Sequence, residues 1–98
     1  MYKDIITYKL ANGITQEHLL ETAQTVIDNW MSKLSGFVSW EIHTNDNGSF
    51  TDVVCWDSKE AAKKAESQMM SIPNAIDWFA CYEVGSIKSQ GLTKVSSF

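Results

Sequence analysis

Two stretches of alternating apolar and polar residues, Phe37–Thr44 and Ser49–Trp56, predict a β-hairpin in the middle of the chain. The segment between them reads Asn-Asp-Asn-Gly, and such residues supply the positive φ angles that tight hairpin turns require. If the hairpin loop has two or four residues, each odd-numbered residue of one strand lies opposite an even-numbered residue of the other strand. Both registers therefore place the same side chains on each face of the hairpin.

One face of this hairpin is predicted to be nearly uniformly apolar, and we expect helices to cover it. It carries Val38, Trp40, Ile42, Thr51, Val53 and Cys55. The opposite face is mixed, with two carboxylates and an imidazole among aromatic and aliphatic side chains. It carries Phe37, Ser39, Glu41, His43, Phe50, Asp52, Val54 and Trp56.

The residues before the hairpin predict a strand followed by a helix. Asp4–Leu10 alternates between apolar and polar residues, and Asn12-Gly13 predicts a turn after it. Thr15 is a good N-cap, and apolar residues then recur at i, i+3 and i+4 spacing over residues 19–34. Gly36 follows this pattern at a position where glycine commonly ends a helix. We expect this amphipathic helix to pack on the sheet.

The residues after the hairpin predict two further helices and a last strand. Asp57 and Glu60 have the spacing of a capping box before an alanine-rich helix, which Pro73 ends. A short third helix is expected over Asn74–Tyr82, and a weakly alternating strand over Ser86–Phe98. The side chains that the third helix is expected to turn toward the core are Ile76, Phe79 and Tyr82.

The predicted order β-α-β-β-α-β, with a small extra helix before the last strand, is typical of a ferredoxin-like α+β sandwich. This fold has one antiparallel sheet with both helices on a single face. The 98 residues allow one domain, residues 1–98. We expect a two-fold homodimer, in which a second copy covers the bare face of the sheet. The side chains on that face are too apolar to stay in water; they are Phe37, Phe50, Val54 and Trp56.

Composition and charge exclude several classes of partner. The net charge is −4 and the chain has no arginine, the residue that most often binds phosphates and base edges, so we expect no nucleic-acid partner. No apolar run approaches the ~20 residues of a membrane span, and residues 1–4 lack the features of a secretory signal. Cys55 and Cys81 form no CxxC motif, so we expect reduced thiols in a cytoplasmic protein.

The stretch LSGFVSWEIHTNDNGSFTDVVCWDSKEAAKKAES resembles the core pattern of the dimeric α+β barrel superfamily, which includes the antibiotic biosynthesis monooxygenase-like and stress-responsive barrel proteins. The matching marks are Gly36-Phe37 after the first helix and Trp56-Asp57-Ser58 before the alanine-rich helix. The hairpin resembles that of uncharacterised members with a G-x-[FW]-x-D-[IV]-V-x-W pattern. The resemblance implies the fold and a homodimer. It does not choose among the oxygenases, haem-degrading enzymes, isomerases and decarboxylases of the superfamily.

Glu41, His43 and Asp52 are the candidate catalytic residues, on the mixed face that we expect to line the barrel interior. With a two-residue turn, His43 lies opposite Asp52, and a carboxylate orients an imidazole base. With a four-residue loop, Glu41 lies opposite Asp52, and the pKa of one carboxyl is raised. Either pair suits proton abstraction from an activated carbon or phenol. The three side chains have the chemistry to hold a divalent metal, but no metal-binding spacing of His and Cys occurs, and we expect neither metal nor cofactor.

Four aromatic side chains are candidates for contact with a flat apolar or aromatic ligand, or for a dry dimer interface: Phe37, Phe50, Trp56 and Trp78. Two functions fit this pattern. The first is a cofactor-independent monooxygenase or isomerase that acts on a small aromatic or polyketide-like molecule. The second is a non-catalytic homodimer that binds a small ligand or has a structural role. The two differ in whether the polar side chains line an enclosed cavity or face bulk water.

Overall fold

The computed structural model describes residues 1–98, and its elements follow the predicted order. The strands are β1 Tyr2–Tyr8, β2 Phe37–Thr44, β3 Phe50–Trp56 and β4 Lys88–Thr93. The α-helices are α1 Gln16–Asn29, α2 Lys59–Ser67 and α3 Ala75–Phe79. Two short 3-10 helices, η1 Met31–Lys33 and η2 Met69–Ser71, follow α1 and α2. The β-α-β-β-α-β order with an extra helix is therefore confirmed.

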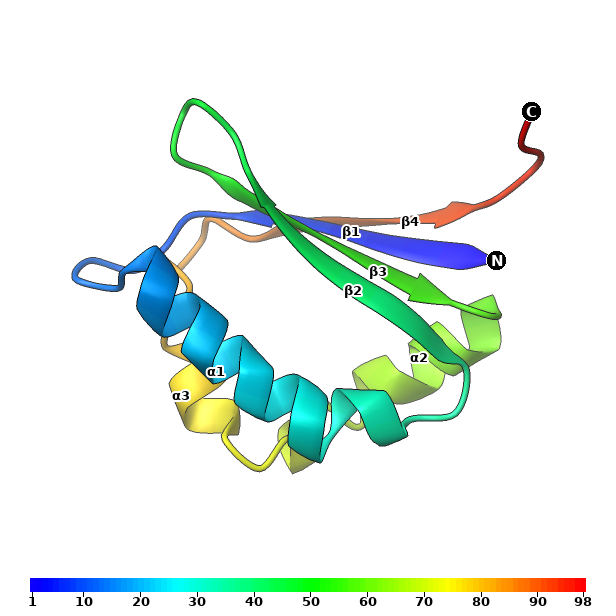
Figure 1. Ribbon diagram of the computed structural model, residues 1–98, viewed down its shortest axis with the longest axis horizontal. Coiled ribbons are helices and arrows are strands. Elements are labelled where there is room, and N and C mark those ends of the chain that lie inside the picture. The colour runs from blue at the N-terminus through cyan, green and yellow to red at the C-terminus, as the bar shows by residue number, and fades with distance from the viewer.

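The four strands form one antiparallel sheet in the order β2-β3-β1-β4. In Figure 1 the helices lie together on one side of this sheet. Strands β1 and β3 are central, whereas every residue of the edge strand β4 is exposed. The predicted ferredoxin-like α+β sandwich is thus confirmed. We call the side of the sheet under the helices the inner face and the opposite side the outer face.

The register of the hairpin differs from both predicted registers. Ile42 pairs with Asp52, so residues of the same parity lie opposite each other. The reason lies in the loop, where the backbone N–H of Asn45 donates to the carbonyl of Ser49 at 3.1 Å and leaves an odd number of residues in the turn. The last turn residue, Gly48, has φ +83°. Three-residue turns that end in a left-handed glycine are a common alternative to the two- and four-residue loops.

This register places the residues of β3 on the faces opposite to those predicted. Trp40 and Ile42 lie on the inner face as expected, but Val53 lies on the outer face beside Glu41. A bulge between Phe37 and Ser39 puts Phe37 and Trp56 on the same face, as predicted: the two residues pair, and their ring centroids lie 5.8 Å apart. The buried inner-face residues of β3 are Phe50, Asp52, Val54 and Trp56.

The first two helices begin at polar caps. As predicted, the Thr15 side chain caps α1 and accepts a hydrogen bond from the backbone N–H of His18 at 3.1 Å. Helix α1 ends at Asn29, before the predicted end, and the chain continues into η1. Helix α2 is capped by Ser58, whose Oγ accepts from the backbone N–H of Ala61 at 3.1 Å, and not by Asp57. Ser58 has the extended backbone that an N-cap requires.

The third helix faces the core only in part as predicted, because Phe79 and Tyr82 pack against the core but Ile76 does not. Ile76 is 86% exposed, whereas Trp78, which was not expected on the core side, is 4% exposed. Helix α3 has five residues, little more than one turn, so helical spacing is a weak guide to which of its side chains faces the core. Its short length leaves one large side chain, Trp78, as its main contribution to the core.

The core lies between the helices and the inner face. Leu19 and Val26 of α1 are fully buried, and Ala62 and Ala65 are the buried residues of α2. These small residues allow α2 to lie close to the sheet. None of the helices combines the length and the apolar character that a membrane span requires.

Candidate functional site

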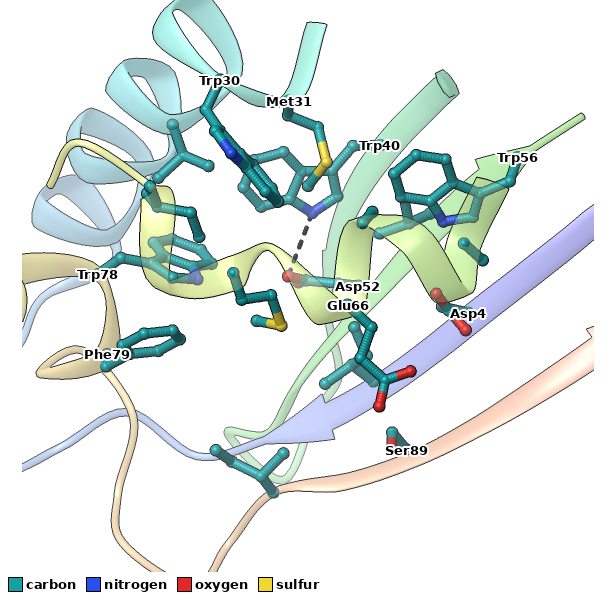
Figure 2. Close-up of a pocket in the computed structure, with 18 of the residues that line it drawn as sticks. Asp4, Trp30, Met31, Trp40, Asp52, Trp56, Glu66, Trp78, Phe79 and Ser89 are labelled. Carbon is teal, nitrogen blue, oxygen red and sulfur yellow. Dashed lines mark hydrogen bonds between the residues drawn. The ribbon is translucent and has the colours of Figure 1, made fainter. Parts of the chain in front are cut away.

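A cavity of about 290 Å³ lies between the helices and the inner face of the sheet (Figure 2). This volume is near the lower end of the ~300–1,000 Å³ of small-molecule pockets. Most of the lining side chains are apolar, and they come from helices and strands alike. The lining includes every tryptophan of the chain, namely Trp30, Trp40, Trp56 and Trp78.

Asp52 is the buried carboxylate of this cavity, with 2% of its surface exposed. Its Oδ1 accepts a hydrogen bond from the Tyr8 hydroxyl at 2.8 Å, and its Oδ2 accepts one from the indole N–H of Trp40 at 3.2 Å. Figure 2 shows the second of these bonds as a dashed line. An ionised carboxylate has about four acceptor positions. Asp52 is therefore held in place by two donors and retains acceptor capacity for a ligand.

The environment of Asp52 brings its pKa close to neutral pH. Burial raises the pKa of Asp52 to about 6, although the hydrogen bonds from Tyr8 and Trp40 and the nearby His43 favour the ionised form. A carboxyl group that titrates in this range accepts and returns a proton efficiently near neutral pH. Burial and the negative charge of Asp52 raise the pKa of Tyr8, so its phenol remains protonated and continues to donate.

Aromatic rings in edge-to-face contact surround this carboxylate. The ring centroids of Trp40 and Trp78 lie 5.3 Å apart, and those of Trp78 and Tyr82 lie 5.2 Å apart. Tyr82 in turn contacts Tyr8 at 4.6 Å. Burial, followed by the charge of Asp52, raises the pKa of Tyr82. These perpendicular contacts hold the rings in fixed orientations and leave an apolar, aromatic wall around Asp52.

A second group of polar side chains lies at the end of the cavity toward β4. Figure 2 shows Asp4, Glu66 and Ser89 together there. Glu66 and Ser89 are exposed, so this end opens to solvent, whereas burial raises the pKa of the less exposed Asp4. The buried indole nitrogen of Trp56 is turned toward Asp4 in Figure 2 and favours the ionised form of that carboxyl, but it makes no hydrogen bond of regular geometry.

Glu41 and His43 do not join Asp52, contrary to both predicted arrangements. They lie on the outer face, where His43 Nε2 and Glu41 Oε1 are 2.8 Å apart and both side chains are more than half exposed. His43 pairs with Thr51 and Glu41 pairs with Val53, so neither residue lies opposite Asp52. The three side chains thus form no common metal-binding set, and no other group of His, Cys, Asp or Glu does so.

The predicted aromatic contacts divide into two pairs. Trp56 and Trp78 line the cavity. Phe37 and Phe50 pack in or against the core and do not line it. Because Phe50 and Trp56 are buried under the helices, together with Val54, they cannot form the predicted dimer interface on the bare face.

Sequence reasoning missed Tyr8 and Trp40 as the hydrogen-bond donors to Asp52, and Tyr82 as part of the aromatic wall around it. Tyr8 and Asp52 are 44 residues apart in the chain, and only the pairing of β1 with β3 brings them together. A signal for Trp40 was present, because a buried indole requires an acceptor for its N–H. Had the hairpin register been known, Asp52 would have been the inner-face acceptor nearest to it.

Comparisons of structure show what this arrangement is similar to. No family model and no curated protein matches the sequence. Among solved structures, a variant of SnoaB, a cofactor-independent oxygenase from Streptomyces nogalater, has a TM-score of 0.74 and 16% identity, covering 98% of this chain and 94% of that one. The ActVA-Orf6 monooxygenase of Streptomyces coelicolor in complex with nanaomycin D has a TM-score of 0.68 and 17% identity, covering 99% of this chain and 89% of that one.

A third solved structure, of an antibiotic biosynthesis monooxygenase, has a TM-score of 0.70 and 10% identity, covering 98% of this chain and all of that one. At such low identities the likeness defines the fold and leaves the activity open. The resemblance found in the sequence is thereby confirmed at this level, and the chain has the ferredoxin-like fold of the antibiotic biosynthesis monooxygenases.

Proposed function

We propose that this protein is a cofactor-independent oxygenase that binds a flat hydroxylated aromatic molecule in the inner cavity, with Asp52 as the proton acceptor. The observation that carries this proposal is the position of Asp52. It is buried in an aromatic-lined cavity, hydrogen-bonded by Tyr8 and Trp40, and has a pKa raised to about 6. A carboxylate in this setting is a better base than one in water.

The chemistry needs only the substrate, oxygen and this base. Asp52 removes a proton from a ring CH₂ group that is activated by neighbouring hydroxyl and carbonyl groups. The resulting carbanion adds O₂, and the proton returns to give a hydroperoxide. Loss of water then leaves a carbonyl, so R₂CH₂ and O₂ become R₂C=O and H₂O. The substrate supplies all the electrons, and the step requires no external reductant.

The cavity supports this chemistry in two ways. Its tryptophan and tyrosine rings stack against a flat aromatic molecule and exclude water from the anion that forms. The protonated Tyr8 and the indole of Trp40 hold the Asp52 carboxylate in one orientation and stabilise it when ionised. The likeness in fold to an oxygenase that works without a cofactor gives the proposal further support.

Oxygen uptake with a hydroxylated anthrone tests the proposal. The protein should accelerate uptake above the uncatalysed rate, and Asp52→Asn should reduce that acceleration about 100-fold or more. The matched control is Asp46→Asn, the same change in charge in the exposed hairpin loop. Substrate conversion without oxygen uptake would instead indicate an isomerase. Binding without conversion would indicate a non-catalytic binding protein.

We further propose that a second copy covers the outer face, which makes the protein a homodimer. The supporting observation is the composition of this face, where the partly buried Ile5, Val53 and Cys55 lie side by side on the central strands. Leu92 on β4 is 47% exposed and lies on the same face, on the other side of Lys3 from Cys55. This surface replaces the one predicted from the sequence.

Cys55 and Cys81 are free thiols, which is compatible with the cytoplasm as the proposed location.

A further inference from the structure

The ionisable side chains that line the cavity are almost all of one sign. Asp4 of β1, Asp52 of β3 and Glu66 of α2 are carboxylates, and Tyr82 is a phenol. None of the eight lysines and neither histidine lines the cavity. Lys63 lies 3.7 Å from Glu66, but both side chains are well exposed to solvent at that ion pair. Inside the cavity, the charge of Asp52 has hydrogen-bond donors but no cationic partner, since His43, which favours the ionised form, lies on the outer face of the sheet.

The neutral part of the lining also favours positive charge. The faces of tryptophan and tyrosine rings carry negative electrostatic potential, and they attract organic cations most strongly where water is excluded. Trp40 and Trp78 meet at right angles beside Asp52, and Tyr82 completes this corner. A cation in this corner would lie beside the carboxylate and close to these rings, although Trp40 presents its N–H edge and not its face to Asp52.

We propose that the inner cavity selects aromatic ligands that carry an ammonium group and rejects ligands that carry a carboxylate or sulfonate. This inference rests on the proposed function, because it assumes that the cavity is the ligand site. An ammonium group paired with Asp52 engages the carboxylate that the proposed reaction needs as its base, so such ligands bind in place of the substrate and inhibit the reaction. The ammonium group lies beside Asp52, and the flat ring lies among the tryptophans.

The physical reason is the low polarity of the site. An ionised Asp52 without a cationic partner is costly in such surroundings, and an ammonium ion relieves this cost. An anion would meet Asp52 at short range without water to screen the repulsion, and Asp4 and Glu66 near the opening would oppose its entry. A hydroxyl group can donate a hydrogen bond to Asp52 but does not neutralise its charge. The affinity of neutral ligands should therefore lie between that of cations and that of anions.

Three probes that share a naphthylmethyl framework test the inference. They are naphthylmethyl-trimethylammonium as the cation, naphthalenemethanol as the neutral ligand and naphthylacetate as the anion. Calorimetry at pH 7.5 measures their affinities. The indole N–H signals in a proton–nitrogen NMR spectrum report the place of binding, because all the tryptophans of the chain line the cavity.

The expected result is that the cation binds at least tenfold more tightly than the neutral probe, while the anion does not bind measurably. Asp52→Asn should abolish the preference for the cation, and Asp46→Asn should retain it. If Asp52→Asn does not fold, Asp4→Asn serves as the second variant, since Asp4 lines the same cavity and is only partly buried. It should reduce the preference by a smaller factor.

Two results would overturn the inference, and they are distinguishable. Equal binding of all three probes, with shifted indole signals, would contradict charge selection and leave the aromatic site of the proposed function intact. Unshifted indole signals with every probe would contradict both charge selection and the ligand site of the proposed function, because no probe would then enter the cavity. The oxygen-uptake assay stands apart from either outcome, since it does not depend on the probes.

Discussion

Tyr8 on β1 donates its hydroxyl hydrogen to Asp52 on β3 at 2.8 Å, and both side chains are buried. The two residues are diagonal neighbours on the inner face, because Tyr8 pairs with Phe50 and Asp52 pairs with Ile6. This bond connects the central strands beneath the helices. It also means that the environment of the candidate base depends on a residue from a distant part of the chain.

Tyr8→Phe should destabilise the fold at pH 7 by ~1.5–3 kcal/mol, because a buried carboxylate loses one of its two donors. It should also raise the pKa of Asp52 further, since the hydrogen bond favours the ionised form. Urea denaturation measures the first effect. Tyr82→Phe is the matched control, because it removes the same atom from a neighbouring tyrosine that is not one of the two donors to Asp52. Equal losses in both variants would contradict a special role for the Tyr8 hydroxyl.

The stability of the protein should depend on the protonation of Asp52. Its pKa is about 6 in the folded chain, against 3.8 for an ordinary exposed aspartate. Between these values the folded state binds more protons than the unfolded state, so stability falls as pH rises from 4 to 6. The contribution amounts to ~3 kcal/mol at most, at 1.36 kcal/mol per pKa unit.

The measurement for this pH dependence is the unfolding free energy of the parent and of Asp52→Asn at pH 4, 5, 6 and 7. The unfolding free energy of the parent should fall relative to that of Asp52→Asn as pH rises from 4 to 6. Above pH 6 the difference should become constant. A difference that stays constant with pH would show that Asp52 titrates normally. Asp4, whose pKa burial also raises, is present in both proteins and cancels.

Gly36→Ala should destabilise the fold more than Gly13→Ala. Both glycines have left-handed backbones, with φ +84° and +85°, which costs an alanine ~1–2 kcal/mol. Only at Gly36 would the new Cβ lie 2.5 Å from the Cβ of Ala61 and 2.6 Å from a carboxylate oxygen of Asp57. The additional loss should be ~1–3 kcal/mol, the usual cost of overpacking. Thermal unfolding of the two variants measures it, and equal losses would mean that α2 shifts freely away from residue 36.

Val53→Lys should convert a homodimer into a monomer, because it places a charge at the centre of the outer face. Sedimentation at micromolar concentration should give a mass near twice 11.0 kDa for the parent and near 11.0 kDa for the variant. Val84→Lys is the control, since Val84 is 99% exposed and lies outside the sheet. A monomeric parent would refute the proposed dimer, and a dimeric Val53→Lys would place the interface elsewhere.

The order of the elements was determined by local information in the sequence. Thr15 caps a helix wherever the following residues repeat at helical spacing, and the alternation before and after residues 45–48 defines two strands. These signals depend on neighbours within a few residues. They therefore predicted the β-α-β-β-α-β fold and the place of Trp40 and Ile42 on the inner face.

The membership of the candidate site was decided by the tertiary structure. An odd number of residues in the hairpin turn reversed the faces of β3, which moved Asp52 from the bare side to the cavity and left Glu41 and His43 outside. Loop length is a weak signal in a sequence that is rich in Asn and Gly, because several turns suit the same residues. The partner Tyr8 depends on strand pairing across 44 residues of chain. Burial and the raised pKa of Asp52 arise only when these distant segments meet under the helices.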